Sequence, residues 1–317
     1  MSRRLGRVTK AIVFVVLLAT AGCSSTDATR VTGAGSSSSA GGSSTAASSS
    51  SGRPSSSGDP TPTGVPRPDH VLLVIFENKD AESVIGSPRA PYLTSLAQAG
   101  ATFTDAHGVA HPSQPNYLAL FSGSTQGVTN DSCPQTFSGP NLAAQLLAAG
   151  HSFTGYSEDL PSAGSTVCRA GGYARKHNPW VDFPALPASV NQPYSAMPGD
   201  PAQLPTVSFV VPNLCNDMHD CGVAAGDRWA KAHLPAYVDW ARTHNGLLVV
   251  TFDEDEGTSG NHIATVLVGP MVKAGTTSAQ RIDHYSVLRT IEDMYGLPPI
   301  GSAAGARPIT GVWTAQN

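Results

Sequence analysis

The stretch His70-Val-Leu-Leu-Val-Ile-Phe76 is an unbroken apolar run, followed at once by the polar pair Glu77-Asn78. A run without polar alternation is typical of a strand that is buried on both faces of a parallel sheet. In an open α/β sheet, ligands bind outside the carboxyl ends of the strands. The stretch therefore predicts the fold class and also the edge of the sheet where a site forms.

Three further segments end in polar clusters in the same way. The clusters are His111 to Asn116 after a Thr/Phe-rich segment, Asn213 to Asp220 after TVSFVVP, and Asp253-Glu254-Asp255 after GLLVVTF. We expect the four clusters to meet at one edge of the sheet. Their carboxylates, amides, histidines and serine suit metal-assisted phosphoryl transfer, with oxygen ligands for a cation and a hydroxyl nucleophile.

Candidate strands and helices alternate along the chain. Strands are expected at His70 to Phe76, Ser152 to Tyr156, Thr206 to Val211, Gly246 to Phe252 and Ile263 to Val268. Helices are expected at Pro91 to Gln98, Asn141 to Ala149, Asp227 to Thr243 and His284 to Met294, with Asn141 and Asp227 as N-caps. This order predicts an α/β fold with a largely parallel sheet and helices on both faces.

The N-terminus has the features of an export signal. Basic residues between Arg3 and Lys10 precede a short apolar run, and small residues then lead to Cys23. We expect residues 1–22 to be a signal peptide. The small residues before Cys23 resemble a bacterial lipobox, although Thr20 stands where Leu is usual, and predict a lipid anchor. The alternative is a plain signal peptide with an incidental cysteine.

Composition separates a linker from a catalytic domain. Residues 23–67 are dominated by Ser, Gly, Thr, Ala and Pro, so they cannot bury enough apolar surface to offset the entropy of ordering. We expect a flexible linker there and one domain over residues 68–317. The net charge is −4 and no basic stripe is present, which argues against a nucleic-acid partner.

The cysteines other than Cys23 are even in number, as expected of disulfides in an exported domain. They are Cys133, Cys168, Cys215 and Cys221, which allow three pairings. Cys215 with Cys221 would close a small loop around His219 and leave Cys133 with Cys168. A zinc site is the rival interpretation, but no CxxC pair supports it.

Ser113 begins a predicted helix, Ser-Gln-Pro-Asn-Tyr-Leu-Ala-Leu-Phe. Pro115 is tolerated because it stands in the first turn. The free N–H groups and the dipole at a helix start favour a bound phosphate, which a hydroxyl at this point would face. The alternative is a capping serine, which is the commonest role there. The nearby His111 and Asn116 favour the catalytic interpretation.

Ser113-Gln-Pro-Asn116 resembles the nucleophile motif of the alkaline-phosphatase-like superfamily. Further motifs, in the same order, resemble the bacterial phosphoesterase family of phospholipases C and acid phosphatases: Glu77-Asn78, Tyr173 to Pro179, Asn216 to Asp220, Asp253 to Asp255 and Asp283 to Leu288. The domain is most similar to small secreted acid phosphatases of mycobacteria, which act on phosphomonoesters including phosphatidylinositol phosphates. The resemblance implies an alkaline-phosphatase-like three-layer α/β/α sandwich.

The resemblance also implies a role for each matching residue. Ser113 is the implied nucleophile, and His219 would stabilise the phosphate or protonate the leaving oxygen. The implied metal ligands are Glu77, Asn78, Ser113, Asp253 and Glu254, and the implied phosphate-binding residues are His111, Asn116, Lys176 and His177. Glu254 stands where a His follows the Asp in two-zinc members, so we expect one divalent metal ion.

Other polar residues near these motifs have simpler interpretations. We expect Asp255 and Glu256 to be solvated loop charges, and His107 and His262 to be structural or exposed. His284 opens a helix and is expected to cap it rather than to contact the site.

These patterns together predict an exported phosphomonoesterase, secreted or lipid-anchored, that acts through a phosphoserine intermediate on a small-molecule or lipid phosphomonoester. A charged histidine as proton donor would favour an acidic working pH. One alternative is a phospholipase C-type phosphodiesterase of the same family. The other is a non-catalytic binding lipoprotein of the cell envelope, which predicts broken nucleophile or ligand positions.

The lipid anchor is testable by changing its attachment residue. A Cys23→Ala variant is expected to move from the membrane fraction to the culture medium, because the flexible linker alone has no affinity for a bilayer. Immunoblots of the two fractions measure this. A wild-type protein that is already fully soluble and cleaved upstream of Cys23 would disprove the lipobox interpretation.

Overall fold

The computed structural model describes residues 64–257 and 259–315 of the chain. The predicted signal peptide, Cys23 and most of the predicted linker lie outside these residues and stay predictions. Among the described helices, none has both the length and the apolar character of a membrane span.

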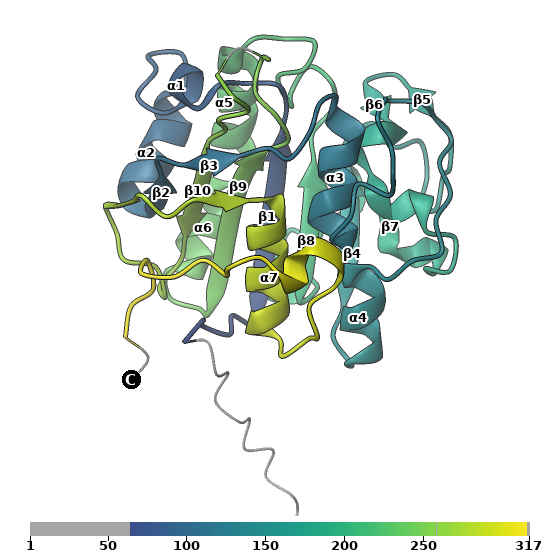
Figure 1. Ribbon diagram of the computed structural model, residues 1–317. Helices are drawn as coiled ribbons and strands as arrows, with labels where there is room; N and C mark the ends of the chain where they lie inside the picture. Colours follow the sequence, from purple (N-terminus) through teal and green to yellow (C-terminus); the bar gives the residue numbers. More distant parts are fainter. Residues whose placement is uncertain (1–63, 258, 316–317) are drawn as a thin grey trace, which may run out of the picture. The chain divides into compact units, whose positions relative to one another are not determined.

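An eight-stranded sheet forms the centre of the domain, in the order β11-β2-β10-β9-β1-β8-β4-β7 (Figure 1). The strands are β1 (His70–Phe76), β2 (Ala101–Phe103), β4 (Phe153–Ser157), β7 (Asn191–Pro193), β8 (Val207–Val211), β9 (Gly246–Phe252), β10 (Thr265–Val268) and β11 (Thr276–Ser278). Strand β1 pairs in parallel with both β8 and β9, whereas β10 is antiparallel to β9 and β2. The prediction of a largely parallel sheet is confirmed.

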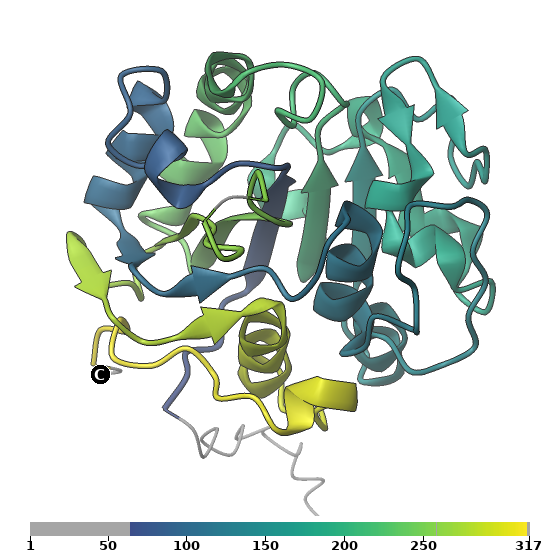
Figure 2. The ribbon, with the colours of Figure 1, turned by 45° about the horizontal axis from the view of Figure 1, so that its top comes forward.

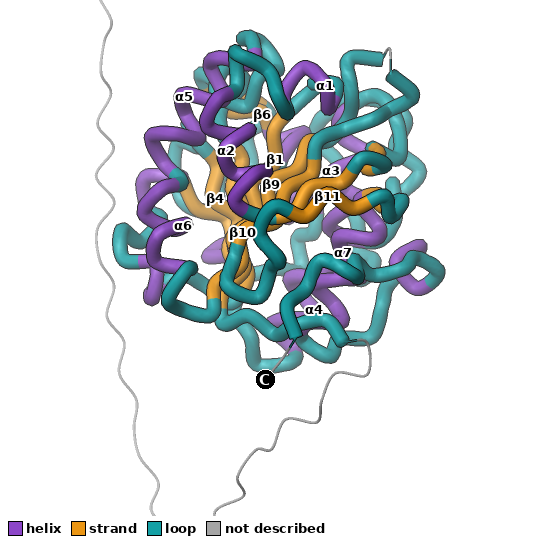
Figure 3. Tube along the Cα trace, turned by 90° about the vertical axis from the view of Figure 1, so that its left-hand side faces the viewer, coloured by secondary structure: helices purple, strands orange, loops and turns teal. Residues whose placement is uncertain are grey.

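Helices cover both faces of this sheet (Figure 3). One layer contains α2 (Pro91–Ala99), α5 (Val223–His233) and α6 (Pro235–Ala241), and the other contains α3 (Ser113–Ser122), α4 (Leu142–Ala148) and α7 (His284–Met294). A short helix, α1 (Ala81–Val84), follows β1. The predicted three-layer α/β/α sandwich is therefore present.

Smaller elements complete the described part of the chain. Two strand pairs lie outside the main sheet: β3 (Ala106–His107) with β12 (Ile282–Asp283), and β5 (Arg169–Ala170) with β6 (Tyr173–Ala174). The remaining elements are short 3-10 turns at Arg175–His177, Pro179–Asp182, Ala188–Val190, Tyr194–Ala196, Pro201–Gln203 and Gly301–Ala304.

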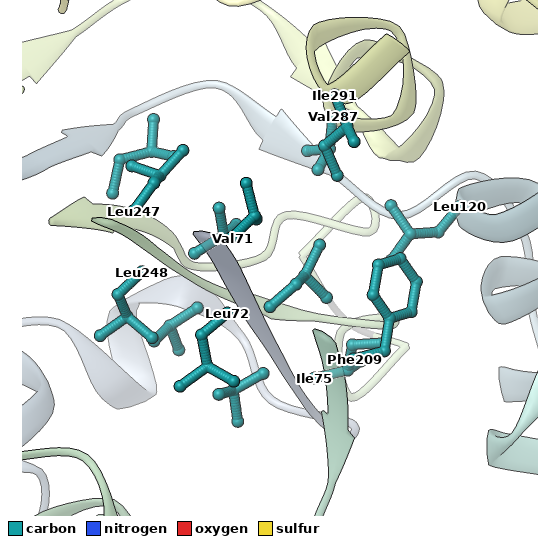
Figure 4. Close-up of a cluster of buried hydrophobic side chains, with 14 of the residues drawn as sticks. Val71, Leu72, Ile75, Leu120, Phe209, Leu247, Leu248, Val287 and Ile291 are labelled. Atoms are coloured by element: carbon teal, nitrogen blue, oxygen red, sulfur yellow. The ribbon is translucent and has the colours of Figure 1, made fainter. Parts of the chain in front are cut away.

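The apolar run that opens the domain is the middle of the core. Every residue from Val71 to Phe76 is at most 1% exposed. Val71 lies toward Val287 and Ile291 of α7, whereas Leu72 packs on the other face of the sheet (Figure 4). Each large apolar side chain buried in this way contributes roughly 1.5–3 kcal/mol. Burial on both faces explains why this strand has no polar alternation.

One of the two predicted N-caps is wrong. The Asn141 side chain accepts a hydrogen bond from Ala144 N and caps α4, as predicted. Asp227 instead lies inside α5, which begins at Val223. Its carboxylate accepts hydrogen bonds from the backbone of α2, at 2.8 Å from Leu93 N. Asp227 is thus a cap supplied to one helix by another, which local sequence does not reveal.

The predicted helix from Asp227 to Thr243 is also wrong, because the structure has two helices there. Helix α5 ends at His233 and α6 begins at Pro235. Proline has no N–H to continue a helix and is well tolerated at a helix start, so Pro235 marks the break.

Both disulfides have the pairing that was expected from a small loop around His219. Cys133 is bonded to Cys168, and Cys215 is bonded to Cys221. The second bridge closes the loop that carries His219, and the first ties together two long surface loops.

Candidate active site

The carboxyl ends of β1 and β9 supply the frame of the site, at the edge that comes forward in Figure 2. The two strands are neighbours in register, with Phe76 paired to Phe252, so Glu77 and Asp253 emerge side by side. Asp253 N donates to Phe76 O at 3.0 Å, and Asn78 N donates to Asp253 Oδ1 at 3.0 Å. Glu77 N also donates to Asp217 O at 2.8 Å, so hydrogen bonds hold the backbone of both acidic residues.

Ser113 points its hydroxyl into this acidic frame. Its Oγ donates to Glu77 Oε2 at 2.9 Å and lies 3.2 Å from Glu254 Oε1. Ser113 is the first residue of α3, directly after the N-cap Pro112, and its hydroxyl makes no cap hydrogen bond. The capping interpretation of Ser113 is therefore wrong, because its hydroxyl is directed at two carboxylates and not at the backbone of α3.

The oxygen atoms around Ser113 fit a divalent cation. Asn78 Oδ1 and Asp253 Oδ2 are buried and have no hydrogen-bond partner. Leaving buried polar oxygens without partners is costly unless a ligand satisfies them. Together with the carboxylates of Glu77 and Glu254, they form the hard-oxygen set that Mg²⁺, Ca²⁺ or Mn²⁺ prefers.

The electrostatics also favour a bound cation. Burial, followed by the charges of Asp253 and Asp217, raises the pKa of Glu77 well above its usual value. Burial and the neighbouring Glu254 raise the pKa of Asp253 to about 7. Burial likewise raises the pKa of Glu254 to about 7. Without a cation, burial and mutual charge repulsion favour the protonated forms of these carboxyl groups.

His177 lies behind Glu77 rather than on the open side of the site. It is buried, with Nε2 at 3.0 Å from Glu77 Oε1 and Nδ1 at 3.3 Å from Asp217 Oδ2. Burial, followed by the charges of Lys176 and His219, lowers the pKa of His177 well below its usual value. In this structure His177 is thus a neutral neighbour of two buried carboxyl groups, and its predicted phosphate contact stays a prediction.

Tyr117 contacts both Glu77 and His177. Its hydroxyl donates to Glu77 Oε1 at 2.5 Å, and its ring stacks on His177 with centroids 5.1 Å apart. Because Tyr117 and Ser113 are one turn apart on α3, one helix orients both the hydroxyl and its acidic neighbour.

A second set of ligand atoms adjoins the first. One atom each of Glu77, His177 and His219 lies within 4.8 Å of the others, which is close enough to bind a metal ion. This triad shares Glu77 with the oxygen set around Ser113. The described residues thus contain a possible metal-binding triad, and they leave the identity of the metal open.

His219 and Lys176 form the opposite wall of the site. Lys176 Nζ lies 3.2 Å from His219 Nε2 and donates to Asp131 Oδ2 at 2.7 Å. Asp220 Oδ1 lies 2.7 Å from His219 Nδ1. The ring is therefore oriented from both sides, with Nε2 directed toward a cationic neighbour.

His111 stands at the open mouth of the site. Its side chain is 46% exposed, its Nδ1 contacts Glu254 Oε2, and its Nε2 lies 3.4 Å from Asp255 Oδ1. A cavity of about 370 Å³ opens here, lined in part by Asn78, His111 and Glu254. Glu254, which lies 3.2 Å from Ser113 Oγ, connects this cavity to the serine.

Asn116 does not face a phosphate, which corrects its predicted role. Its Oδ1 accepts hydrogen bonds from Val109 N at 2.9 Å and Ala110 N at 3.0 Å. Its Nδ2 donates to Ala110 O at 2.8 Å and Pro112 O at 3.3 Å. These four bonds use the full capacity of the amide. Asn116 therefore shapes the loop that carries His111.

Asp255 is not a solvated loop charge, contrary to expectation. It is buried, and its carboxylate accepts backbone hydrogen bonds from Gly257, Ser259 and Asn261. Glu256 is the exposed residue of the pair, 2.9 Å from Lys79 Nζ. Asp255 thus organises the loop after β9.

The remaining histidines lie mostly outside the site. His107 pairs with Asp105 and His262 with Glu82, in agreement with structural roles. His284 is buried, and its Nε2 lies 2.6 Å from Asp253 O. The cap of α7 is Asp283, so the expectation that His284 caps this helix is wrong.

Asp131, Asp217 and Tyr117 were missed by sequence reasoning. Asp217 and Tyr117 lie inside the motifs quoted above, but only their buried contacts to Glu77 and His177 reveal a role. Asp131 stands in an irregular loop without any local signal. It accepts a hydrogen bond from Gln114 N at 3.0 Å, so one free N–H at the α3 start is already used.

A model of the Phosphoesterase family matches residues 75–298. The chain belongs to the phosphoesterase family. It is 51% identical over 247 residues to phosphatidylinositol-3-phosphatase of Mycobacterium tuberculosis, covering 77% of this chain and 82% of that protein. The family places the chain among the enzymes that hydrolyse phosphate esters.

More distant relatives agree with this placement. The chain is 32% identical to the phosphate-repressible acid phosphatase of Penicillium chrysogenum over 74% of its length, and it spans 60% of that protein. A solved structure of a protein in the alkaline phosphatase superfamily from Vibrio parahaemolyticus matches with a TM-score of 0.56 at 15% identity. That match covers 78% of this chain and 72% of the other. It supports the predicted alkaline-phosphatase-like fold.

The corrected role of Asn116 predicts a loss of stability. Asn116→Ala removes four hydrogen bonds from the loop at residues 109–112 and should lower the free energy of unfolding by about 2–3 kcal/mol. Denaturant unfolding measures this change. A variant of unchanged stability that only binds inorganic phosphate more weakly would restore the original assignment.

Proposed function

We propose that this protein hydrolyses phosphate monoesters through a phosphoserine intermediate on Ser113. The observation that carries the proposal is the position of Ser113 Oγ, between Glu77 and Glu254 at the start of α3. A serine hydroxyl is a weak nucleophile unless a neighbouring base or cation activates it. Attack on phosphorus would form the Oγ–P bond and release the leaving alcohol, and water would then cleave the phosphoserine.

We propose one divalent cation, held by Glu77, Asn78, Ser113, Asp253 and Glu254. Such an ion would lower the pKa of the serine hydroxyl and neutralise charge on the phosphoryl oxygens. The support is the pair of unpartnered oxygens at Asn78 and Asp253, together with the crowded carboxylates. The triad of Glu77, His177 and His219 is the competing arrangement.

Lys176 and His219 are proposed to act on the leaving-group side. In the present geometry, Lys176 can donate to His219 Nε2 while Nδ1–H is directed at Asp220. A proton held between the two side chains can pass to the departing alkoxide, which would otherwise leave as a poor anionic group. His111 at the open mouth is proposed to contact the incoming phosphate.

We propose that the substrates include phosphatidylinositol phosphates. The support is the name of the mycobacterial relative, which shares 51% of aligned residues, and the names of the fungal relatives support an acid phosphatase. A phosphodiesterase activity of the phospholipase C type is the alternative within the family. A non-catalytic binding protein is disfavoured, because the nucleophile and ligand positions are intact.

The phosphoserine is directly testable. Ser113→Ala should lower kcat for p-nitrophenyl phosphate by about 10³-fold or more and leave inorganic phosphate binding intact, since only the nucleophile is lost. Acid quench with ³²P-labelled substrate should trap label on the wild-type peptide that contains Ser113. High residual activity of the variant with metal still bound would instead indicate direct attack by water.

Metal affinity should depend on pH in a defined direction. Asp253 and Glu254 have raised pKa values near 7, so below pH 7 a cation must displace protons from them. We expect Mn²⁺ affinity, measured calorimetrically, to rise about tenfold per pH unit per displaced proton between pH 6 and 7. Asp253→Asn should weaken binding at pH 8 by about tenfold or more. Full activity of a metal-free preparation would disprove the metal site.

A further inference from the structure

A second cavity shares Lys176 with the site. It has a volume of about 400 Å³ and is lined by Asp131, Cys133, Cys168, Arg169, Ala174 and Lys176. None of these residues lines the cavity at His111. The Ser113 site is therefore flanked by two cavities, and the proposed chemistry gives a function to only one of them.

Short hydrogen bonds connect this cavity to the nucleophile. Gln114 N, next to Ser113, donates to Asp131 Oδ1 at 3.0 Å, and Asp131 Oδ2 accepts from Lys176 Nζ at 2.7 Å. Lys176 Nζ in turn lies 3.2 Å from His219 Nε2. A leaving group that departs toward Lys176 and His219 therefore has this cavity in front of it.

The cavity contains one positive charge that the protein itself does not neutralise. Asp131 and Lys176 already pair with each other. Arg169 is exposed, and its guanidinium forms no ion pair or hydrogen bond with any residue between 64 and 315 that the structure describes. The acidic Asp159 at the same hairpin turn is occupied, since it accepts from Gly172 N at 3.2 Å and Asn213 Nδ2 at 3.0 Å.

The backbone holds Arg169 in a fixed place. It lies in β5, opposite Ala174 of β6, on the α3 side of the domain (Figure 1). Its neighbour Cys168 is bonded to Cys133 and accepts a backbone hydrogen bond from Arg175 N at 3.0 Å. A planar guanidinium presented from a rigid hairpin is suited to two-point binding of a phosphate group.

We propose that Arg169 is a specificity-determining residue that binds a second phosphate, as monoester or diester, carried by the leaving group of the substrate. The inference rests on the proposed phosphomonoesterase function and defines its substrate class. The headgroup of a phosphatidylinositol phosphate and a soluble bisphosphate share this chemistry. An ester with an uncharged leaving group does not.

The test compares substrates that differ in the second anion. The substrates are p-nitrophenyl phosphate, inositol 1,3-bisphosphate and a short-chain phosphatidylinositol 3-phosphate. Arg169→Ala should lower kcat/KM for the two inositol substrates by about 10- to 100-fold, mainly through KM, as loss of one charge-assisted contact predicts. For p-nitrophenyl phosphate the change should stay within about twofold. Arg169→Lys should retain part of the selectivity, because lysine keeps the positive charge but cannot bind a phosphate through two parallel N–H groups.

Arg242→Ala is the matched control. Arg242 is an exposed arginine that precedes β9, so it lies near the amino-terminal ends of the strands, whereas the site lies at their carboxyl ends. An equal loss on all three substrates would assign Arg169 a structural role and overturn the inference, as would no loss on any. A decrease in kcat/KM for the lipid substrate alone would indicate that Arg169 is attracted to a lipid surface. That result would also contradict the proposed phosphate-binding role. If the wild type cleaves none of the three, the proposed function itself fails.

Discussion

The crowding of buried carboxyl groups at the ends of adjacent strands is the constraint on which this site depends. Glu77 and Asp253 leave neighbouring parallel strands, and Asp217 and Glu254 lie beside them in the interior. Each carboxylate raises the cost of ionising the others, and burial removes the water that would screen them. A cation, protons or both must accompany them. This crowding is the physical basis of the metal site that we propose.

A neutral histidine and a lysine surround this cluster of carboxyl groups. His177 is kept uncharged by burial and lies between Glu77 and Asp217, so it separates two carboxyl groups without adding a fixed charge. Lys176 supplies the positive charge on the opposite wall. Helix α3 links the two walls, since Ser113 faces the acidic frame while Gln114 N contacts Asp131, the partner of Lys176. Ser113, the proposed nucleophile, therefore stands at the boundary between an acidic region and a basic one.

Most of the candidate site residues lie in loops. Disulfide bonds or several backbone hydrogen bonds stabilise these loops. The Cys215–Cys221 bridge encloses His219, and the Cys133–Cys168 bridge fixes a wall of the second cavity. Asn116 stabilises the loop that carries His111 by accepting backbone hydrogen bonds. Asp255 stabilises the loop after β9 in the same way. Disulfides of this kind are typical of exported proteins, in which a rigid site must persist outside the cytoplasm.

Local sequence determined the features that depend on neighbouring residues. The apolar runs at His70–Phe76 and Gly246–Phe252 specified two central strands with their observed bounds, because burial on both faces demands continuous apolar residues. The rule for open α/β sheets then placed Glu77, Ser113 and Asp253 at one edge. Only tertiary structure decided which polar atoms remain free. It used all the hydrogen bonds of Asn116, buried His177 and Asp255, and made Asp227 a cap for another helix. It also left the Arg169 guanidinium without a partner among the described residues. Hydrogen-bond partners from distant segments set these outcomes, and no local pattern encodes them.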